Sequence, residues 1–316
     1  MTGTAARSAG PTRHRVRRAY IGPLLIVGDE GSRLSGALRV AEAVARRHAV
    51  KVHVLVVLPP LASPSPYLLS RAAVLERYER EACRREAEHI RLRRQVHEIV
   101  GRSSFFSTAV ETGEYLSTAS AAVRVRKVEY LLVGLPERGA PERAEAENSA
   151  LRLAETVDLP VLAVPADAAL LPRTALVSMA LGEASMRAAR ATVPLLAHGG
   201  SLALAHVLPE AEVARSEGRT GPGPRILERA LQRLRSTLRL ARNLEVRTMV
   251  GYGNPAEVLL EMGQDIDLIA VGLPTRRAFG RVRTGIVGIN VLRGAGRTVL
   301  IVPAPRQTAP SPAPQR

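Results

Sequence analysis

The sequence has few aromatic residues and almost no cysteine: its 316 residues include no tryptophan, three phenylalanines and one cysteine. Aromatic platforms on which the bases of a single-stranded nucleic acid could stack are therefore largely missing. The one cysteine, Cys83, excludes an intrachain disulfide and indicates a reducing compartment, which favours a cytoplasmic location. No apolar run approaches the ~20 residues of a membrane-spanning helix, and we expect no secretory signal.

Motifs of common enzyme classes are also missing. The sequence contains no G-x-S-x-G, no Walker A motif, and neither the CxxC nor the HxxxH spacing of a metal site. His89 and His97 fall in a polar helical stretch, where solvated side chains are expected. We therefore expect no catalytic residues, no metal ligands, and a protein that is not an enzyme.

Lysine is rare, yet the chain is strongly basic. The formal net charge of +16 comes mainly from arginine, since Lys51 and Lys127 are the only lysines. A GC-rich genome explains this composition without any partner, and attraction to an acidic partner is the second explanation. Residues 1–18 carry several arginines and no acid. We expect a disordered tail there, with a contact arm for nucleic acid or anionic lipid as the alternative.

Apolar runs alternate with helical patterns in two similar halves. The length suffices for two domains, and the hydrophobic content of 46% supports a core in each. Ten runs predict strands at residues 23–29, 52–58, 105–110, 128–133, 161–164, 174–179, 202–208, 246–250, 268–271 and 298–302. Helical spacing predicts a long charged helix over 71–102, with Leu75, Tyr78 and Ala82 buried, and a helix over 227–238.

The two halves repeat with a period of roughly 140 residues, which is too long for a solenoid and indicates duplicated domains. We place the domains at 19–165 and 173–304, with a linker at 166–172 and a disordered tail at 305–316. Ser32 and Ser35 are candidate caps of the first helix. Pro194 falls inside the corresponding helix of the second half and predicts that this helix is shortened.

Residues 268–302 contain a strand that ends at Gly272, a basic segment, and a helix that begins near Gly285. Such glycines allow backbone N–H groups to face a phosphate. This stretch resembles the C-terminal third of the universal stress protein family, whose nucleotide-binding members have G-x2-G-x9-G-[ST] here. Gly272 and Gly285 match the first and third glycines, whereas Thr275 stands in the place of the second and Ile286 in that of the hydroxyl residue.

Residues 29–38 resemble the D-G-S segment of the same family, in which an aspartate lies by the ribose and adenine. Asp29 takes that place, although an Asx-turn at a strand end explains it equally well. The resemblance implies an α/β fold of two doubly wound five-stranded parallel sheets with strand order 3-2-1-4-5. It implies ATP or another adenine nucleotide as ligand, with Mg²⁺, at Asp29, Gly272, Thr275 and Gly285.

Each half departs from the family's binding pattern. In the first half, Glu147 and Asn148 replace the late glycine and the hydroxyl residue, and a carboxylate repels phosphate oxygens. In the second half, Ala180 replaces the aspartate. We therefore expect a non-catalytic tandem universal stress protein with a stress-related regulatory or binding role, in which ATP binding is weak or lost.

Two other functions stay open. The chain could be a scaffold that holds an acidic protein partner through its basic surface. It could also be a nucleotide-dependent enzyme of the same α/β group, although it has neither the HxGH nor the SGGxDS motif of that chemistry. Residues 29–32 resemble the latter only faintly. Salt-dependent association would favour the scaffold, and saturable ATP binding would favour the stress protein.

The resemblance also implies how the halves meet, because family dimers pack the fifth strands of two subunits across a two-fold axis. Here these strands are residues 161–164 and 299–302, and each is followed by a proline. Both are apolar edge strands, which need to be covered. We therefore expect an intrachain pseudo-dimer with Leu162 and Ile301 buried between the halves, and a monomer or homodimer of such units.

Overall fold

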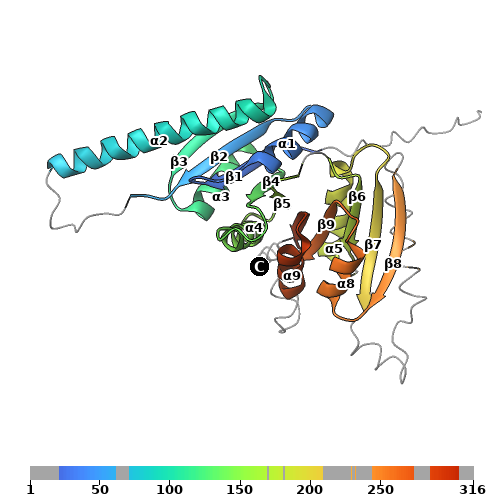
Figure 1. Ribbon diagram of the computed structural model, residues 1–316. Helices are drawn as coiled ribbons and strands as arrows, with labels where there is room; N and C mark the ends of the chain where they lie inside the picture. The colour runs from blue at the N-terminus through green and yellow to red at the C-terminus, as the bar shows by residue number, and fades with distance from the viewer. Residues whose placement is uncertain are drawn as a thin grey trace, which may run out of the picture.

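The computed structural model describes residues 21–61, 71–168, 171–180, 182–208, 229, 232, 244–273 and 285–305. The predicted N-terminal tail, the C-terminal tail beyond residue 305 and Thr275 lie outside these ranges, as does nearly all of the helix predicted at 227–238. Elements are labelled as in Figure 1.

The first half alternates five strands with four helices, as the apolar pattern predicts. Its elements are β1 (Leu24–Asp29), α1 (Ser35–His48), β2 (Val52–Leu58), α2 (Arg71–Val100), β3 (Phe106–Thr112), α3 (Tyr115–Arg126), β4 (Tyr130–Leu135), α4 (Arg143–Val157) and β5 (Val161–Pro165). Within this half the strand order is β3-β2-β1-β4-β5, and every pair is parallel. The predicted order 3-2-1-4-5 is confirmed.

The second half repeats this arrangement. Its described elements are β6 (Thr174–Ser178), α5 (Glu183–Thr192), the 3₁₀ turn η2 (Val193–Leu195), β7 (Ser201–Leu208), β8 (Glu245–Tyr252), α8 (Pro255–Met262), β9 (Leu268–Leu273), α9 (Gly285–Ala295) and β10 (Thr298–Pro303). Pro194 lies inside η2, so α5 ends before it and is shorter than α1, as predicted. Proline cannot donate the backbone bond that would continue the helix.

The two sheets join into one sheet of ten described strands, because β5 and β10 pair antiparallel. Leu162 lies opposite Leu300, and Val161 opposite Ile301. Leu162 is 1% exposed and Ile301 is 0% exposed, so the predicted intrachain pseudo-dimer is confirmed. Figure 1 shows the consequence: the halves lie beside each other, with β5 and β10 at the centre.

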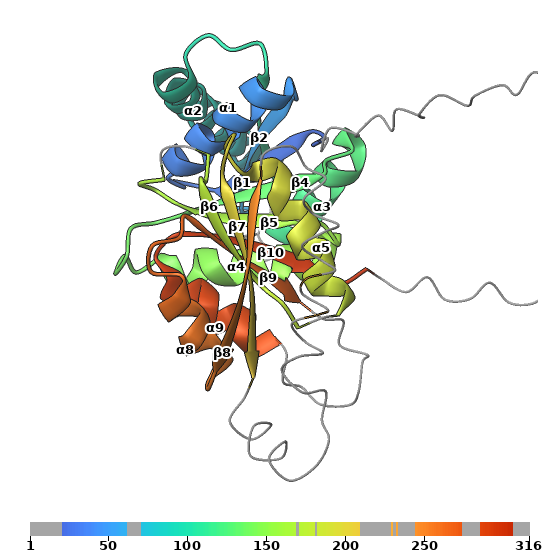
Figure 2. The same ribbon diagram turned by 90° about the vertical axis from the view of Figure 1, so that its right-hand side faces the viewer.

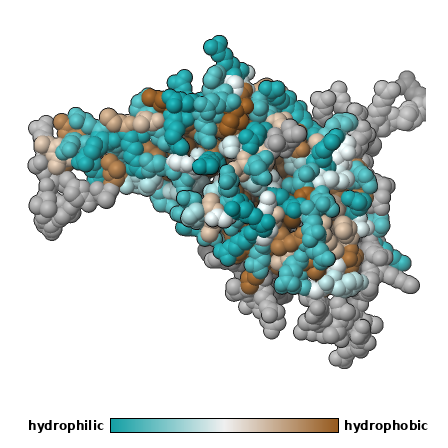
Figure 3. All heavy atoms as spheres, viewed as in Figure 1, coloured by the Kyte–Doolittle hydropathy of each residue, from teal (hydrophilic) through white to brown (hydrophobic). Residues whose placement is uncertain are grey.

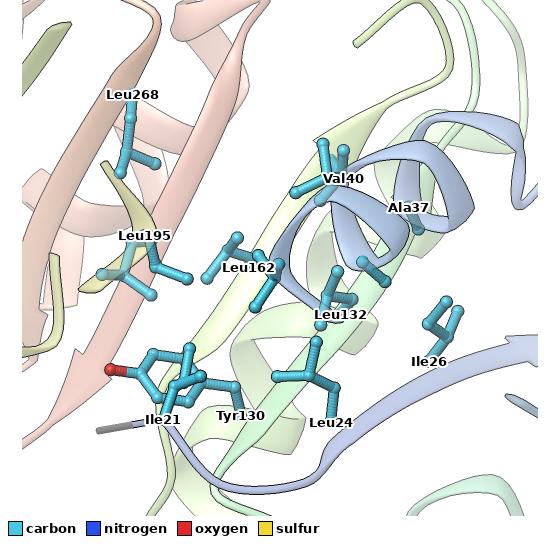
Figure 4. Packing of buried hydrophobic residues seen from close by; sticks show 14 of the residues in the cluster. Ile21, Leu24, Ile26, Ala37, Val40, Tyr130, Leu132, Leu162, Leu195 and Leu268 are labelled. Carbon is cyan, nitrogen blue, oxygen red and sulfur yellow. The ribbon is translucent and has the colours of Figure 1, made fainter. Parts of the chain in front are cut away.

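Helices cover both faces of the sheet. Successive residues of β1 show why: Leu24 and Ile26 belong to the apolar cluster that includes residues of α1, α2 and α5, whereas Leu25 and Val27 belong to the cluster that includes residues of α3, α4, α8 and α9. Such strands are buried on both faces, and this explains their continuous apolar runs. Both clusters contain residues of both halves, so the core continues across the junction. Figure 4 shows Leu162 and Tyr130 of the first half near Leu195 and Leu268 of the second.

Polar bonds also tie the halves together. The Tyr130 hydroxyl donates to the Ala191 carbonyl at 2.9 Å, and the His48 imidazole bonds the Pro194 carbonyl at 2.9 Å. Burial, more than the nearby Arg47 charge, lowers the pKa of His48 below its usual value. Figure 2 shows α5, the helix that contains Ala191, packed beside the junction strands. Apolar packing and these hydrogen bonds together hold the two halves against each other.

Two local predictions are wrong. Leu75 and Tyr78 are 60% and 69% exposed, because α2 packs through Leu92, Val96 and Val100 nearer its other end. Figure 1 shows the N-terminal part of α2 extending past the sheet, and Figure 3 shows small apolar areas scattered over this otherwise hydrophilic face. Ser32 and Ser35 do not cap α1, since its N-cap is Leu34, without a side-chain bond.

No helix in the described part of the chain is both long enough and apolar enough to cross a membrane.

Candidate functional site

The candidate sites lie at the carboxyl ends of the parallel strands, where open α/β sheets bind ligands. Leu131 pairs with Val161 as Ile269 pairs with Val299, so β4 and β5 correspond to β9 and β10 residue by residue. Counting forward from these strands places Gly134 and Gly272 in equivalent positions. Every departure from the family pattern can therefore be compared between the halves.

Asp29 ends β1 as predicted, and its polar groups are engaged within its own turn. The backbone N–H of Asp29 donates to the Ser32 hydroxyl at 2.8 Å, and that hydroxyl donates to the Asp29 carboxylate. The Ser32 N–H donates to the Asp29 carbonyl at 3.1 Å. Asp29 is exposed and so stays accessible to a ligand. Because the Ser32 N–H bonds the Asp29 carbonyl and not its carboxylate, this is a backbone β-turn and not the Asx-turn that the sequence offered as the second explanation.

The turn after β1 is fastened to α2 through Glu30. The Arg84 guanidinium donates to Glu30 through two nitrogens and to the Pro59 carbonyl at 3.0 Å. The hydrogen bond from Arg84 lowers the pKa of Glu30 below its usual value. Tyr115 completes this region: burial, with a contribution from the Asp29 charge, raises the pKa of its phenol above the usual range. Tyr115 therefore stays neutral beside Asp29.

A buried ion pair occupies the start of α4, where a phosphate would bind in the first half. Arg143 Nε donates to Glu147 Oε1 at 2.8 Å, and Arg143 Nη1 donates to the Pro136 carbonyl at 2.6 Å. Arg143 is 7% exposed and Glu147 is 4% exposed. The guanidinium is thus held by a carboxylate and a carbonyl of the chain itself. The sequence predicted that Glu147 would repel phosphate. Its carboxylate also binds the Arg143 guanidinium, a cation that could otherwise attract phosphate.

The other residues at the carboxyl ends of β1 and β4 contact one another. Arg33 and Glu137 form an exposed ion pair at 3.6 Å across the ends of β1 and β4. A Cβ on Gly134 would lie 2.7 Å from the Arg33 carbonyl oxygen, so this glycine lets the chain before α1 cross the end of β4. These residues do not fit a triphosphate, because the carboxylates of Glu137 and Glu147 face the place where its charge would lie.

In the second half, Gly272 lies where the sequence places it and serves packing. A Cβ there would lie 2.6 Å from the Ala184 carbonyl carbon and 2.7 Å from the Ser185 nitrogen. The first turn of α5 therefore approaches the end of β9 as closely as the loop before α1 approaches β4. The register confirms that Ala180 is the counterpart of Asp29, since Leu25 and Leu176 are equivalent in their pairings. In the described part of the chain, β6 is therefore followed by no counterpart of the Asp29 carboxylate.

Gly285 is the first residue of α9, as predicted. The backbone N–H groups of a first helical turn lack helical partners and favour an anion. Ile286 is 51% exposed in that turn and offers no hydroxyl to a ligand. Thr275 lies outside the described residues. Gly272 and Gly285 thus lie near the end of β9 and at the start of α9, and residues 274–284 between them lie outside the described residues.

Sequence reasoning missed Arg143 as a site residue. The spacing of Arg143 and Glu147, four residues apart on one helix, was the available signal, because such pairs face each other. Among the described residues, no group of three or more histidine, cysteine, aspartate or glutamate side chains could hold a metal ion.

Comparison with known families matches residues 172–303 to the universal stress protein family. A universal stress protein from Archaeoglobus fulgidus superimposes with a TM-score of 0.59 at 18% identity, covering 92% of this chain and 100% of that one. A putative universal stress protein from Pseudomonas aeruginosa gives 0.51 at 15% identity, with 90% and 94% covered. A protein of unknown function from the same organism gives 0.53 at 16% identity, again with 90% and 94% covered.

No curated protein sequence matches the chain significantly. At such identities the structural likeness establishes the fold, and it extends over both halves. Residues 172–303 therefore match the universal stress protein family, and the first half of the chain repeats the same fold.

Proposed function

We propose that this chain is a non-catalytic, cytoplasmic regulatory or binding protein whose adenine-nucleotide site is degenerate. The observation that carries the proposal is the buried pair of Arg143 and Glu147 at the start of α4. A phosphate chain would have to lie against the Glu147 carboxylate, and Arg143 offers it only Nη2, since Nε and Nη1 are bound by the chain. The carboxylate opposes binding, so the first half has lost its ATP site.

The second half keeps a weak site for ATP, with Mg²⁺ bound through the phosphates. The start of α9 at Gly285, which follows the β9 strand that contains Gly272, would supply backbone N–H groups to the anion. Ala180 provides no carboxylate for the ribose, and Ile286 no hydroxyl for a phosphate. Loss of hydrogen bonds to charged groups weakens binding by about 1.5–3 kcal/mol each. The affinity is therefore well below that of a site with all these groups.

Titration of Gly285→Asp with ATP and Mg²⁺ tests the location of the site. An aspartate at the start of α9 places a negative charge against the phosphates, so residual binding should be lost. Ala82→Asp is the control, because it adds the same charge at an exposed position of α2 in the first half. Equal ATP affinity in wild type and Gly285→Asp would place the site elsewhere.

The pairing of β5 with β10 also supports a proposal on assembly. In the family arrangement these edges would pair between subunits, whereas here each covers the other within one chain. We therefore propose a monomer, or a dimer of two-domain units formed through other surfaces. Its partners are proteins that recognise the stress signal. If a partner is acidic, its association with the chain should weaken as the salt concentration rises.

A further inference from the structure

A cavity of about 320 Å³ lies at the junction of the halves. Tyr130 is the first residue of β4, and Pro160 directly precedes β5. Val302, near the carboxyl end of the antiparallel β10, completes the strand side, and α5 contributes Arg187 and Arg190. The cavity therefore opens at the amino ends of the first-half strands, and on the second-half side it lies next to β9, because Val302 pairs with Gly272.

The two arginines differ in what they bind. Arg187 Nη1 donates to Asp158 Oδ1 at 3.0 Å and to the Pro303 carbonyl at 2.7 Å, so its charge is matched. Arg190 is exposed, and within the described part of the chain no hydrogen bond or ion pair engages it. The described lining contains no carboxylate. Among the described residues, the cavity thus presents one guanidinium without a partner beside an apolar wall.

Comparison of the halves shows what this guanidinium lacks. By the register of β1 and β6, Gly36 corresponds to Arg187 and Arg39 to Arg190. Gly36 lies against the Pro165 carbonyl, just as Arg187 bonds the Pro303 carbonyl, which supports the correspondence.

In the first half, the counterpart of Arg190 has two acceptors. Arg39 donates to the carbonyls of Ala166 and Ala168, the latter at 2.9 Å. Arg190 occupies the same position in its own half. It does not bond Ala304, the counterpart of Ala166, and residue 306, the counterpart of Ala168, lies outside the described residues. A guanidinium fork matches an oxyanion with two oxygens, such as a carboxylate or phosphate.

We infer that this cavity binds a small organic anion, with its carboxylate or phosphate head on Arg190 and its apolar body against Tyr130, Pro160 and Val302. The volume is at the lower end of the range of ligand pockets, which favours a body the size of one ring. The Tyr130 hydroxyl is turned toward the Ala191 carbonyl, so the ring itself forms the apolar wall. Figure 4 shows that hydroxyl directed away from Leu24. Such a ligand would bridge the two halves.

Calorimetric titration of the full chain with phenyl phosphate and with benzoate tests the inference, with benzyl alcohol as the uncharged control. Wild type should bind at least one anion saturably and benzyl alcohol far more weakly. Arg190→Gln should weaken anion binding by about tenfold to a hundredfold, because a charge-assisted hydrogen bond is lost. Arg94→Gln, an exposed arginine of α2, should leave the affinity unchanged.

A second variant keeps the charge and fills the space. Ala191 lines the cavity, and Ala191→Leu should block the ligand while Arg190 remains. Gly285→Asp should bind the anions as wild type does, which separates this site from the nucleotide site. Lack of saturable binding to wild type would overturn the inference. Equal affinity in Arg190→Gln, or binding lost only in Gly285→Asp, would overturn it as well.

Discussion

Replacing Ile301 with aspartate places a charge at the centre of the junction between the halves. Ile301 is 0% exposed and lies opposite Val161 in the antiparallel β5–β10 pair. Loss of its burial costs about 1.5–3 kcal/mol. An unpaired buried carboxylate adds several kcal/mol more. The sum of about 5 kcal/mol or more approaches the whole stability of an ordinary domain, about 5–15 kcal/mol.

The assay is urea unfolding followed by circular dichroism, together with small-angle scattering of the native variant. Ile90→Asp is the matched control, since Ile90 is 52% exposed on α2 and its replacement should change the stability little. We expect Ile301→Asp to unfold at a much lower urea concentration, or to keep folded halves that have separated and scatter as an extended particle. An unfolding midpoint equal to that of Ile90→Asp, with unchanged scattering, would refute the role of this strand pair.

Three further predictions concern the candidate sites and the junction between the halves. Gly272→Ala should destabilise the chain by about 1–3 kcal/mol, because its Cβ would meet the backbone of α5; an unchanged melting temperature contradicts this. Glu147→Gln should cost about 3–5 kcal/mol in urea unfolding, since it leaves the buried Arg143 without a carboxylate. Glu137→Gln, which breaks an exposed pair, should cost less than about 1 kcal/mol. Burial lowers the pKa of His48, so the folded state binds fewer protons than the unfolded state. The unfolding free energy should therefore fall as the pH drops below about 6.5, the usual pKa of histidine. His48→Gln should weaken that dependence, and an identical pH profile would exclude a contribution from His48.

The strands could be predicted from the sequence because parallel strands buried on both faces are continuous apolar runs. The shortening of α5 followed from Pro194, since proline removes a helical bond. These two features depend on local composition, which a single sequence contains. The strand order and the pairing of β5 with β10 were implied by the resemblance to the universal stress protein family, and the apolar edges that need a cover agree with that pairing. The domain limits at 166–172 stay a prediction, although β5 ends at Pro165 and β6 begins at Thr174.

The features that could not be predicted depend on three-dimensional contacts. The apolar spacing of α2 indicates a buried stripe, yet it does not say which part of the helix lies over the sheet, so Leu75 and Tyr78 were misplaced. The role of Gly272 in packing against α5 depends on a backbone approach between distant segments. The pair of Arg143 and Glu147 was visible as a spacing, but its burial at the start of α4 was not. The sequence thus predicted where the candidate site lies. That Arg143 and Glu147 bind each other there is known only from the structure.

Native mass spectrometry of the purified full chain, with analysis of the small molecules released on denaturation, tests the central claim most directly. The account predicts that the chain carries no stoichiometric ATP, and that added ATP binds weakly at no more than one site. Recovery of one or two tightly bound ATP molecules per chain would contradict the degenerate site, above all if Glu147→Gln left their number unchanged.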